Sequence, residues 1–172
     1  MNPAVESAPA FLGKFRGLVS DVNDPLMVGR IRAYVPDVFG DEESGWALPC
    51  APFGGAQSGF FALPAAGAGV WMEFEHGDPE YPVWTGAWFG SANDVPPVLL
   101  SPPYRKTVIQ TQGGHQVVLD DTPGVGGITL QTATGQKVSL TPAGIEIDNG
   151  QGARVKLVGP MVQVNDGALE VT

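Results

Sequence analysis

The 172-residue sequence contains few of the side chains from which disulfides and reactive sites are built. It has a single cysteine, Cys50, so no intrachain disulfide can form, and its two histidines are His76 and His115. Cys50 lies among alanine and proline residues with no charged neighbour to activate its thiolate, which predicts a buried, structural side chain. Stability must therefore come from packing and from oligomerisation.

Basic residues are also scarce in this chain. It has 9 Lys and Arg against 18 Asp and Glu, which gives a net charge of −9. A protein that binds nucleic acid neutralises phosphates with Lys and Arg, so the composition argues against a nucleic-acid partner. The same balance argues against charge-driven binding to anionic membrane surfaces.

Long apolar runs and helical periodicity are missing as well. No stretch approaches the roughly 18 apolar residues of a membrane span, and the N-terminal residues lack the pattern of a signal peptide. We therefore expect synthesis and folding in a bacterial cytoplasm. The 24 glycines and 16 prolines, with no sustained helical spacing of apolar residues, predict an all-β chain.

What the chain has instead is a repeat of short strands from residue 105 to 172. The apolar residues Ile128, Ile145 and Val162 recur every 17 residues, each in the second strand of a pair. The first strands recur at intervals of 21 and 17 residues, and the additional residues fall in the loop 123–127, where an insertion costs little. This spacing indicates a repeat architecture.

Each strand of the repeat alternates apolar and polar side chains, which produces one apolar face and one polar face. The region offers no helix and almost no large aromatic residue to cover the apolar face, so further copies of the chain are the simplest cover. We predict a trimeric, triple-stranded β-helix or prism in which backbone groups pair between chains and no open edge remains. Its predicted core consists of Val117, Leu119, Ile128, Leu130, Val138, Leu140, Ile145, Ile147, Val155, Leu157, Val162 and Val164.

The N-terminal half reads as a small closed barrel of antiparallel strands. Strands are expected at residues 11–22, 28–35, 46–50, 58–63, 69–75 and 83–89. In the second strand, Val28, Ile31, Ala33 and Val35 are the candidate core residues. The bulk of the barrel core and its subunit contacts is expected from the aromatic residues Trp46, Phe60, Phe61, Trp71, Phe74, Trp84 and Trp88.

Two turns that each contain an Asp-Pro pair are expected between strands of the barrel. Asp24 and Pro25 form the first, because proline presets φ and the aspartate side chain accepts a hydrogen bond from the backbone two residues on. Gly29 then opens the returning strand, where a β-bulge would accommodate it. Gly77, Asp78 and Pro79 form the second turn. These six residues are interpreted as conformational and not catalytic.

Several spaced motifs of the barrel resemble one family. The segment 17–36 resembles the opening of the oligonucleotide-binding (OB) type barrel of phage baseplate assembly protein V and of related spike proteins, including the valine-glycine repeat proteins of type VI secretion. The segments 46–49, 64–74 and 77–86 match further motifs of that family in the expected order. The resemblance implies an N-terminal arm at 1–10, an OB-fold barrel at 11–90, a Pro-rich linker at 91–104 and a repetitive β-prism shaft at 105–172.

The resemblance also implies a function. It predicts a homotrimeric structural spike of a contractile phage tail or phage-derived injection machine, located in the virion baseplate or the injection particle. The barrels are expected to dock on a baseplate hub protein, and the shaft to contact the target membrane only mechanically. The C-terminal end has no His-x-His metal site, so Leu169 and Val171 are instead expected to contact a small cone-shaped tip protein.

Other functions compete with this interpretation. Glu73, Glu75, His76, Asp78 and Glu80 form the densest polar cluster, but their spacing on a strand and a turn favours a solvated hairpin over a metal site. Neither a carboxylate pair for glycoside hydrolysis nor a catalytic triad can be placed. We therefore expect no enzymatic activity and no cofactor. The alternative is a trimeric OB-fold module that binds a glycan or another ligand through its aromatic residues.

Overall fold

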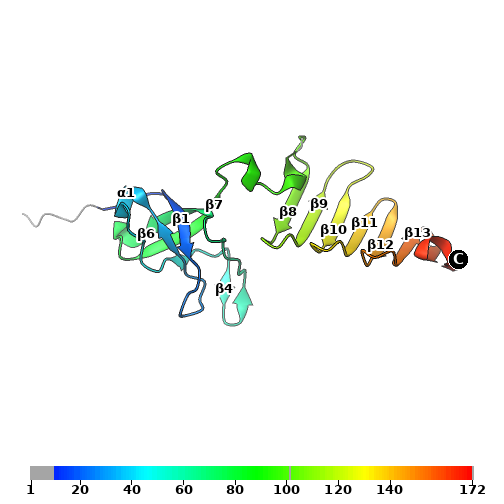
Figure 1. Ribbon diagram of the computed structural model, residues 1–172, viewed down its shortest axis with the longest axis horizontal. Coiled ribbons are helices and arrows are strands. Elements are labelled where there is room, and N and C mark those ends of the chain that lie inside the picture. Colours follow the sequence, from blue (N-terminus) through cyan, green and yellow to red (C-terminus); the bar gives the residue numbers. More distant parts are fainter. Residues whose placement is uncertain (1–9, 101, 172) are drawn as a thin grey trace, which may run out of the picture. The chain divides into compact units, whose positions relative to one another are not determined.

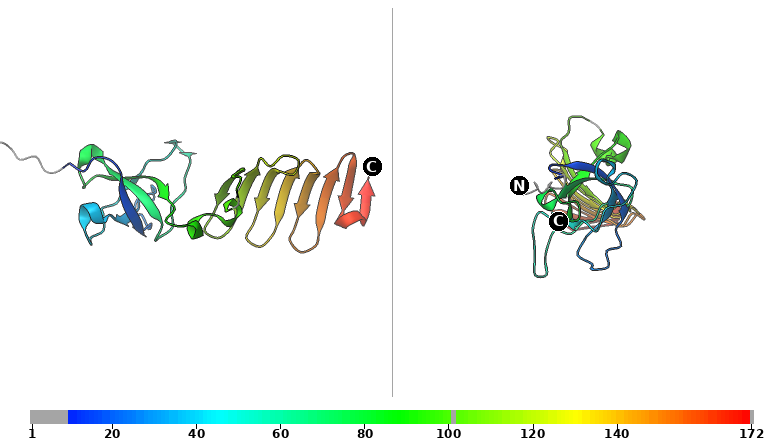
Figure 2. Two further views of the ribbon diagram at one scale, coloured as in Figure 1. Left: turned by 90° about the horizontal axis from the view of Figure 1, so that it is seen from above. Right: turned by 90° about the vertical axis from the view of Figure 1, so that its left-hand side faces the viewer.

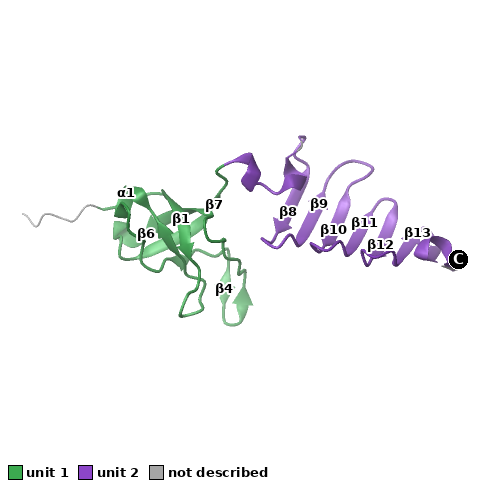
Figure 3. Ribbon diagram, in the orientation of Figure 1, with its two compact units in different colours: residues 1–90 green, residues 91–172 purple. Residues whose placement is uncertain are grey.

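The computed structural model describes residues 10–100 and 102–171 and shows a nearly all-β chain. The chain divides into two compact units, Met1–Gly90 and Ser91–Thr172 (Figures 1 and 3). The expected N-terminal arm lies outside the described residues except for Ala10. In the described part, no helix has both the length and the apolar character that crossing a membrane requires.

Unit 1 is a small barrel built on a five-stranded sheet of order β2-β1-β6-β7-β3. Isolated bridges from Ile31 to Ala47 and from Tyr34 to Glu43 link the β2 side of the sheet to the segment before β3 and so close the barrel. The β3–β7 pair is parallel and departs from the expected antiparallel pairing. The elements are β1 (Phe15–Asp21), β2 (Arg32–Tyr34), α1 (Pro36–Phe39), β3 (Leu48–Pro49), β4 (Gly54–Gly55), β5 (Ser58–Gly59), β6 (Gly69–Phe74), η1 (Glu75–Gly77) and β7 (Pro82–Trp88).

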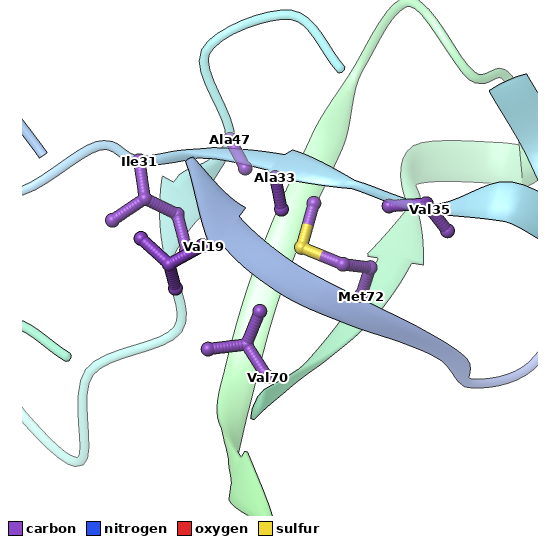
Figure 4. Close-up of a cluster of buried hydrophobic side chains, with 7 residues drawn as sticks. All are labelled: Val19, Ile31, Ala33, Val35, Ala47, Val70 and Met72. Atoms are coloured by element: carbon purple, nitrogen blue, oxygen red, sulfur yellow. The ribbon is translucent and has the colours of Figure 1, made fainter. Parts of the chain in front are cut away.

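The barrel core consists of small and aliphatic side chains. Figure 4 shows its members, which are Val19, Ile31, Ala33, Val35, Ala47, Val70 and Met72. The predicted core positions Ile31, Ala33 and Val35 are confirmed, since all three are fully buried. The prediction for Val28 was wrong. It lies on the loop that curls around Asp24 before the strand begins, so half of its side chain is exposed.

The prediction that aromatic residues fill the barrel core was wrong for most of the seven residues named. Of these only Phe74 is buried, and its ring packs against those of Phe11, Phe15 and Phe39 at centroid distances of 5.6 to 6.2 Å. Trp84 packs against the core from its margin. The centre of so narrow a barrel has room for Val, Ile, Ala and Met, and the larger rings lie nearer its surface.

The strand expected at residues 58–63 is reduced to β5. It pairs with β4 in a hairpin whose strands have two residues each, away from the main sheet. In Figure 1 this hairpin projects from the barrel. Residues 60–63 run on without a strand partner. On β7, β6 pairs along one side, and on the other side β3 pairs with Val83 and Trp84.

Unit 2 contains an eight-stranded antiparallel meander in which each strand pairs with its neighbours in the chain, in the order β8 to β15 (Figure 2). The expected hairpin pairing of the repeat is thus confirmed. Residues 91–104 precede the sheet and include η2 (Ala92–Asp94) and η3 (Pro97–Leu99). The remaining elements are β8 (Lys106–Gln110), β9 (Gln116–Asp120), β10 (Gly127–Gln131), β11 (Lys137–Thr141), β12 (Gly144–Asp148), β13 (Arg154–Val158), β14 (Met161–Val164), η4 (Asn165–Gly167) and β15 (Leu169–Val171).

One part of the prism prediction is corrected by this topology. Backbone hydrogen bonds were expected to run between chains, but the ladders from β8 to β15 run within one chain. The short turns of the repeat bring consecutive strands together first, so local hairpins satisfy the backbone. Association between chains must then rely on side chains and on the two edge strands.

Candidate trimer interface and barrel surfaces

The residues predicted as the trimer core lie on one face of the unit 2 sheet. Residues directly opposite each other in an antiparallel ladder point to the same side, so the register assigns them to rows. One row crosses the sheet through Val117, Leu130, Val138, Ile147, Val155 and Val164, and the other through Leu119, Ile128, Leu140, Ile145, Leu157 and Val162. We call these two rows together the aliphatic face.

The aliphatic face is open in the single chain. Leu130 keeps 48% of its surface exposed and Ile147 keeps 51%, although both lie on interior strands of the sheet. A groove of about 750 Å³ follows the first row, with Val138 and Val155 in its lining. Soluble proteins rarely leave a continuous aliphatic surface of this kind uncovered.

The opposite face of the same sheet carries charge. Arg154 lies between three carboxylates, with its Nη1 at 3.7 Å from Glu146 and its Nε at 3.8 Å from Asp148 and 3.5 Å from Asp166. Lys156 donates a hydrogen bond of 2.6 Å to Asp166, and this bond is the main cause of the lowered pKa of that carboxyl. Partly exposed ion pairs such as these stabilise little. They mark this side as the polar face of the sheet.

His115 occupies a structural position at the edge of the aliphatic face. Its Nδ1 accepts a long hydrogen bond of 3.4 Å from the backbone N–H of Ala133, and the backbone N–H of His115 donates to Thr111 Oγ1 at 3.1 Å. These contacts join one turn of the repeat to the next. In the described part of the chain, no three His, Cys, Asp or Glu side chains come together as a possible metal site.

The two residues expected to contact a tip protein extend the rows of the aliphatic face onto the last strand. Leu169 lies opposite Val164 and Val171 lies opposite Val162. Both are more than half exposed, and β15 is an edge strand. The geometry thus leaves an apolar surface at the end of the sheet, and its contact with a tip protein stays a prediction.

In the barrel, Asp24 is the centre of the first turn. Its Oδ1 accepts hydrogen bonds from the Leu26 N–H at 3.0 Å, as predicted, and from the Arg30 guanidinium. Its Oδ2 accepts from the N–H groups of Val28 and Arg30 at 2.9 and 3.2 Å. These donors, with Arg30 first, hold the pKa of Asp24 well below its usual range. Sequence reasoning missed Arg30 as the partner, because spacing alone does not show that the chain curls back on Asp24.

Gly29 and Gly77 are required for their backbone conformations. Gly29 has φ +83° and is a left-handed turn residue instead of the expected strand bulge, and its C=O accepts a hydrogen bond from Trp84 Nε1 at 3.1 Å. Gly77 has φ +78°, and a side chain there would lie 3.0 Å from Ala10 Cβ. Its neighbour Asp78 accepts the Glu80 N–H at 3.0 Å. These contacts support a conformational interpretation of both turns.

Three indole rings of the barrel, those of Trp46, Trp71 and Trp88, are covered by arginines of the same chain. The Arg16 guanidinium lies 5.7 Å from the Trp71 ring and 5.2 Å from the Trp88 ring. Arg30 and Arg32 both lie over Trp46, at 5.5 and 5.1 Å. A glycan-binding or base-stacking platform needs free aromatic faces, and these contacts leave none of the three indole rings free to serve as one.

Cys50 contradicts its prediction, because the structure exposes it. It follows β3 on the loop that leads into the β4–β5 hairpin, and it is not among the residues of the barrel core. Sequence reasoning also missed the exposed Phe53, Phe60 and Phe61 as one surface. The signal that could have found them is the absence of any charged residue between Glu43 and Glu73.

Comparison with known families assigns both units. Residues 15–89 match the type VI secretion system/phage-baseplate injector OB domain, and residues 106–170 match the phage baseplate V C-terminal trimerisation domain. The two matches follow the order of the barrel and the strand meander along the chain.

Two relatives come from Vibrio cholerae serotype O1. The actin cross-linking toxin VgrG1 of the Classical Ogawa strain is 33% identical over 105 residues, which cover 56% of this chain and 10% of the toxin. The type VI secretion system spike protein VgrG3 of the El Tor Inaba strain is 30% identical over 112 residues, which cover 59% of this chain and 11% of VgrG3. The matched region thus spans about a tenth of each relative.

Proposed function

The chain belongs to the family of phage baseplate V and type VI secretion injector proteins, and from that membership we propose that three copies form the central spike of a contractile injection machine. The barrel is the OB domain of this family and the strand meander is its trimerisation domain. Both domains together are the parts that a trimeric spike needs.

The observation that carries the proposal is the open aliphatic face. Its two rows cross the eight-stranded sheet, and most of its residues keep more than a third of their surface exposed in the single chain. Covering the remaining apolar surface of one such side chain stabilises by about 1 kcal/mol. Many residues of this kind in each copy give a strong drive to associate, and the charged opposite face remains in water.

The same geometry suits a mechanical role. Each copy contributes a sheet whose backbone ladders run from strand to strand within the chain, and three such sheets packed by their aliphatic faces enclose one dry core. Bending this rod requires breaking side-chain packing in all three sheets at once. We propose that the shaft transmits the force of contraction into the target envelope.

We propose two further partners on the same basis. The OB barrels dock on a baseplate hub, and the apolar end at Leu169 and Val171 contacts a small cone-shaped tip protein. The chain itself does no chemistry in this proposal. Its motif residues at both turns of the barrel hold backbone conformations, as Asp24 and Gly77 illustrate.

The test is the mass of the full chain in solution by light scattering. We expect about 54 kDa, three times the 18.0 kDa of one chain. Leu130→Lys should reduce the mass to that of the monomer, because it places three charges in the shared core. Thr129→Lys is the matched control, since the neighbouring residue points to the opposite face, and it should leave the trimer intact.

A wild-type chain that stays monomeric at micromolar concentration would contradict the spike and favour a single-domain binding module. The position of the spike within the machine needs a second measurement. Antibody labelling of assembled particles, viewed by electron microscopy, should mark the baseplate end. Labelling along the tube or the sheath instead would overturn the central position.

A further inference from the structure

We propose that the apolar groove beside the β4–β5 hairpin is the contact between neighbouring barrels in the trimer. The inference rests on the proposed function, because it takes three copies as given. The groove measures about 660 Å³ and lies between the hairpin loop and the segment from Met27 to Gly29. It is separate from the aliphatic face of unit 2, which binds the copies through the shaft.

The groove is lined by large side chains that have no cover in the single chain. Phe61 keeps 70% of its surface exposed and Phe53 keeps 63%. Met27 and Val28 are exposed on the opposite wall. The hairpin that links Phe53 to Phe61 rests on two residue pairs, Gly54 with Gly59 and Gly55 with Ser58, and on the Phe60 N–H, which donates to the Phe53 C=O at 3.2 Å. A hairpin of that size is marginal in water on its own, so contact with a partner surface would stabilise it.

One wall of the groove is anchored to the barrel. Trp84 Nε1 donates to the Gly29 C=O at 3.1 Å, and Asp24 Oδ2 accepts the Val28 N–H at 2.9 Å. The ring of Phe61 lies so close to Gly29 that a Cβ there would approach it to 3.0 Å. The shape of the groove is therefore fixed by the barrel and does not depend on the hairpin alone.

Charge favours a second copy of this chain as the occupant. The chain carries a net charge of −9, so three copies repel one another wherever acidic surfaces meet. The groove lining contains no charged residue, and none occurs anywhere between Glu43 and Glu73. An uncharged, aromatic surface is the part of the barrel that copies can bring together without that cost.

The trimerisation domain supplies the second reason. It tethers three barrels to one shaft, and tethering raises their effective concentration to the order of millimolar. At that concentration even a small apolar contact is occupied most of the time. A hub protein has to find the groove from solution, whereas the neighbouring barrel is always present.

Cys50 provides a natural probe, because it lines the groove and is the only cysteine of the chain. Its alkylation by iodoacetamide, followed by mass spectrometry, is to be compared between the wild-type trimer and the Leu130→Lys chain. We expect the trimer to react at least about tenfold more slowly, since thiol reactivity follows exposure. Light scattering on the same samples reports the oligomeric state.

Phe61→Asn isolates the contact between copies. In the trimer this substitution should abolish the protection of Cys50, while light scattering still shows three chains. The same substitution in the Leu130→Lys background measures any shielding of Cys50 by Phe61 within one chain. Tyr81→Asn is the matched control, an exposed aromatic residue that is absent from the groove lining, and it should leave the protection unchanged.

Equal reactivity of Cys50 in the trimer and in the Leu130→Lys chain overturns the inference, because the groove is then open in the spike and free for a hub or another protein. The proposed function survives that result as long as the wild-type mass is that of a trimer. A monomeric wild-type chain, in contrast, removes the proposed function itself.

Discussion

The guanidinium of Arg30 donates two hydrogen bonds to one carboxylate oxygen of Asp24, from Nε at 2.9 Å and from Nη2 at 2.7 Å to Oδ1. The same carboxylate accepts three backbone N–H groups of the loop that leads to β2. Asp24 is 9% exposed, so these bonds are shielded from water. The pair fixes the path by which the chain enters the barrel wall that Ile31 and Ala33 complete.

Replacing this carboxylate should weaken the barrel and leave the shaft assembled. Asp24→Asn keeps the size of the side chain but removes its charge, and it leaves the Arg30 guanidinium without a carboxylate partner. We therefore expect the melting temperature of the barrel to fall by about 5–10 °C. All four tryptophans lie in unit 1, so intrinsic fluorescence follows this unit. Asp41→Asn, at an exposed loop position, is the control and should melt as the wild type does.

Acid should destabilise the barrel in a defined direction. The pKa of Asp24 is held below its usual range by Arg30 and the backbone donors, so the folded state binds a proton less readily than the unfolded state. Its stabilisation is therefore complete above about pH 4 and is lost as the pH falls further, toward the lowered pKa. Fluorescence-detected urea unfolding between pH 6 and pH 3, at about one-unit steps, should show a steeper loss for wild type than for Asp24→Asn. Parallel curves would mean that the carboxylate is not linked to folding.

The trimer should resist salt. The contacts that we propose between copies are apolar, and the ion pairs of Arg154 and Lys156 lie on the face opposite the aliphatic face. At about 1 M NaCl the Debye length falls to roughly 3 Å, which screens exposed pairs but strengthens apolar association. Light scattering in high salt should still give the mass of three chains. Dissociation by salt would place charged groups in the interface.

Gly69 should tolerate no side chain. A Cβ at this position would lie 2.5 Å from the Trp88 ring, which is tied down by its Nε1 donating to the Val70 C=O at 3.1 Å. Gly69→Ala is expected to cost about 1–3 kcal/mol of barrel stability through overpacking. Gly45→Ala is the control, since a Cβ there meets only Pro82 at 4.0 Å. Denaturant unfolding, monitored by tryptophan fluorescence, compares the stability of the Gly69→Ala and Gly45→Ala variants. An unchanged midpoint for Gly69→Ala would show that Trp88 can move aside.

Local chemistry let the sequence specify the repeat and the turns. Alternation with a period of two sends Val138 and Leu140 to one face and Ser139 to the other, whatever the rest of the chain does. The Asp24 turn is equally local, because the carboxylate reaches an N–H two residues away. Both features depend only on neighbours along the chain, so the sequence by itself determines them.

Only the tertiary structure decided which surfaces are covered. Cys50 and Phe61 are apolar by composition, yet both are exposed, because barrel closure through Ile31 and Ala47 leaves their loop outside the core. The hydrogen-bond partners of the shaft strands were likewise undetermined, since an alternating pattern pairs equally well within a chain or between chains. Burial depends on volume and on contacts distant in sequence, and a pattern of residues along the chain contains neither.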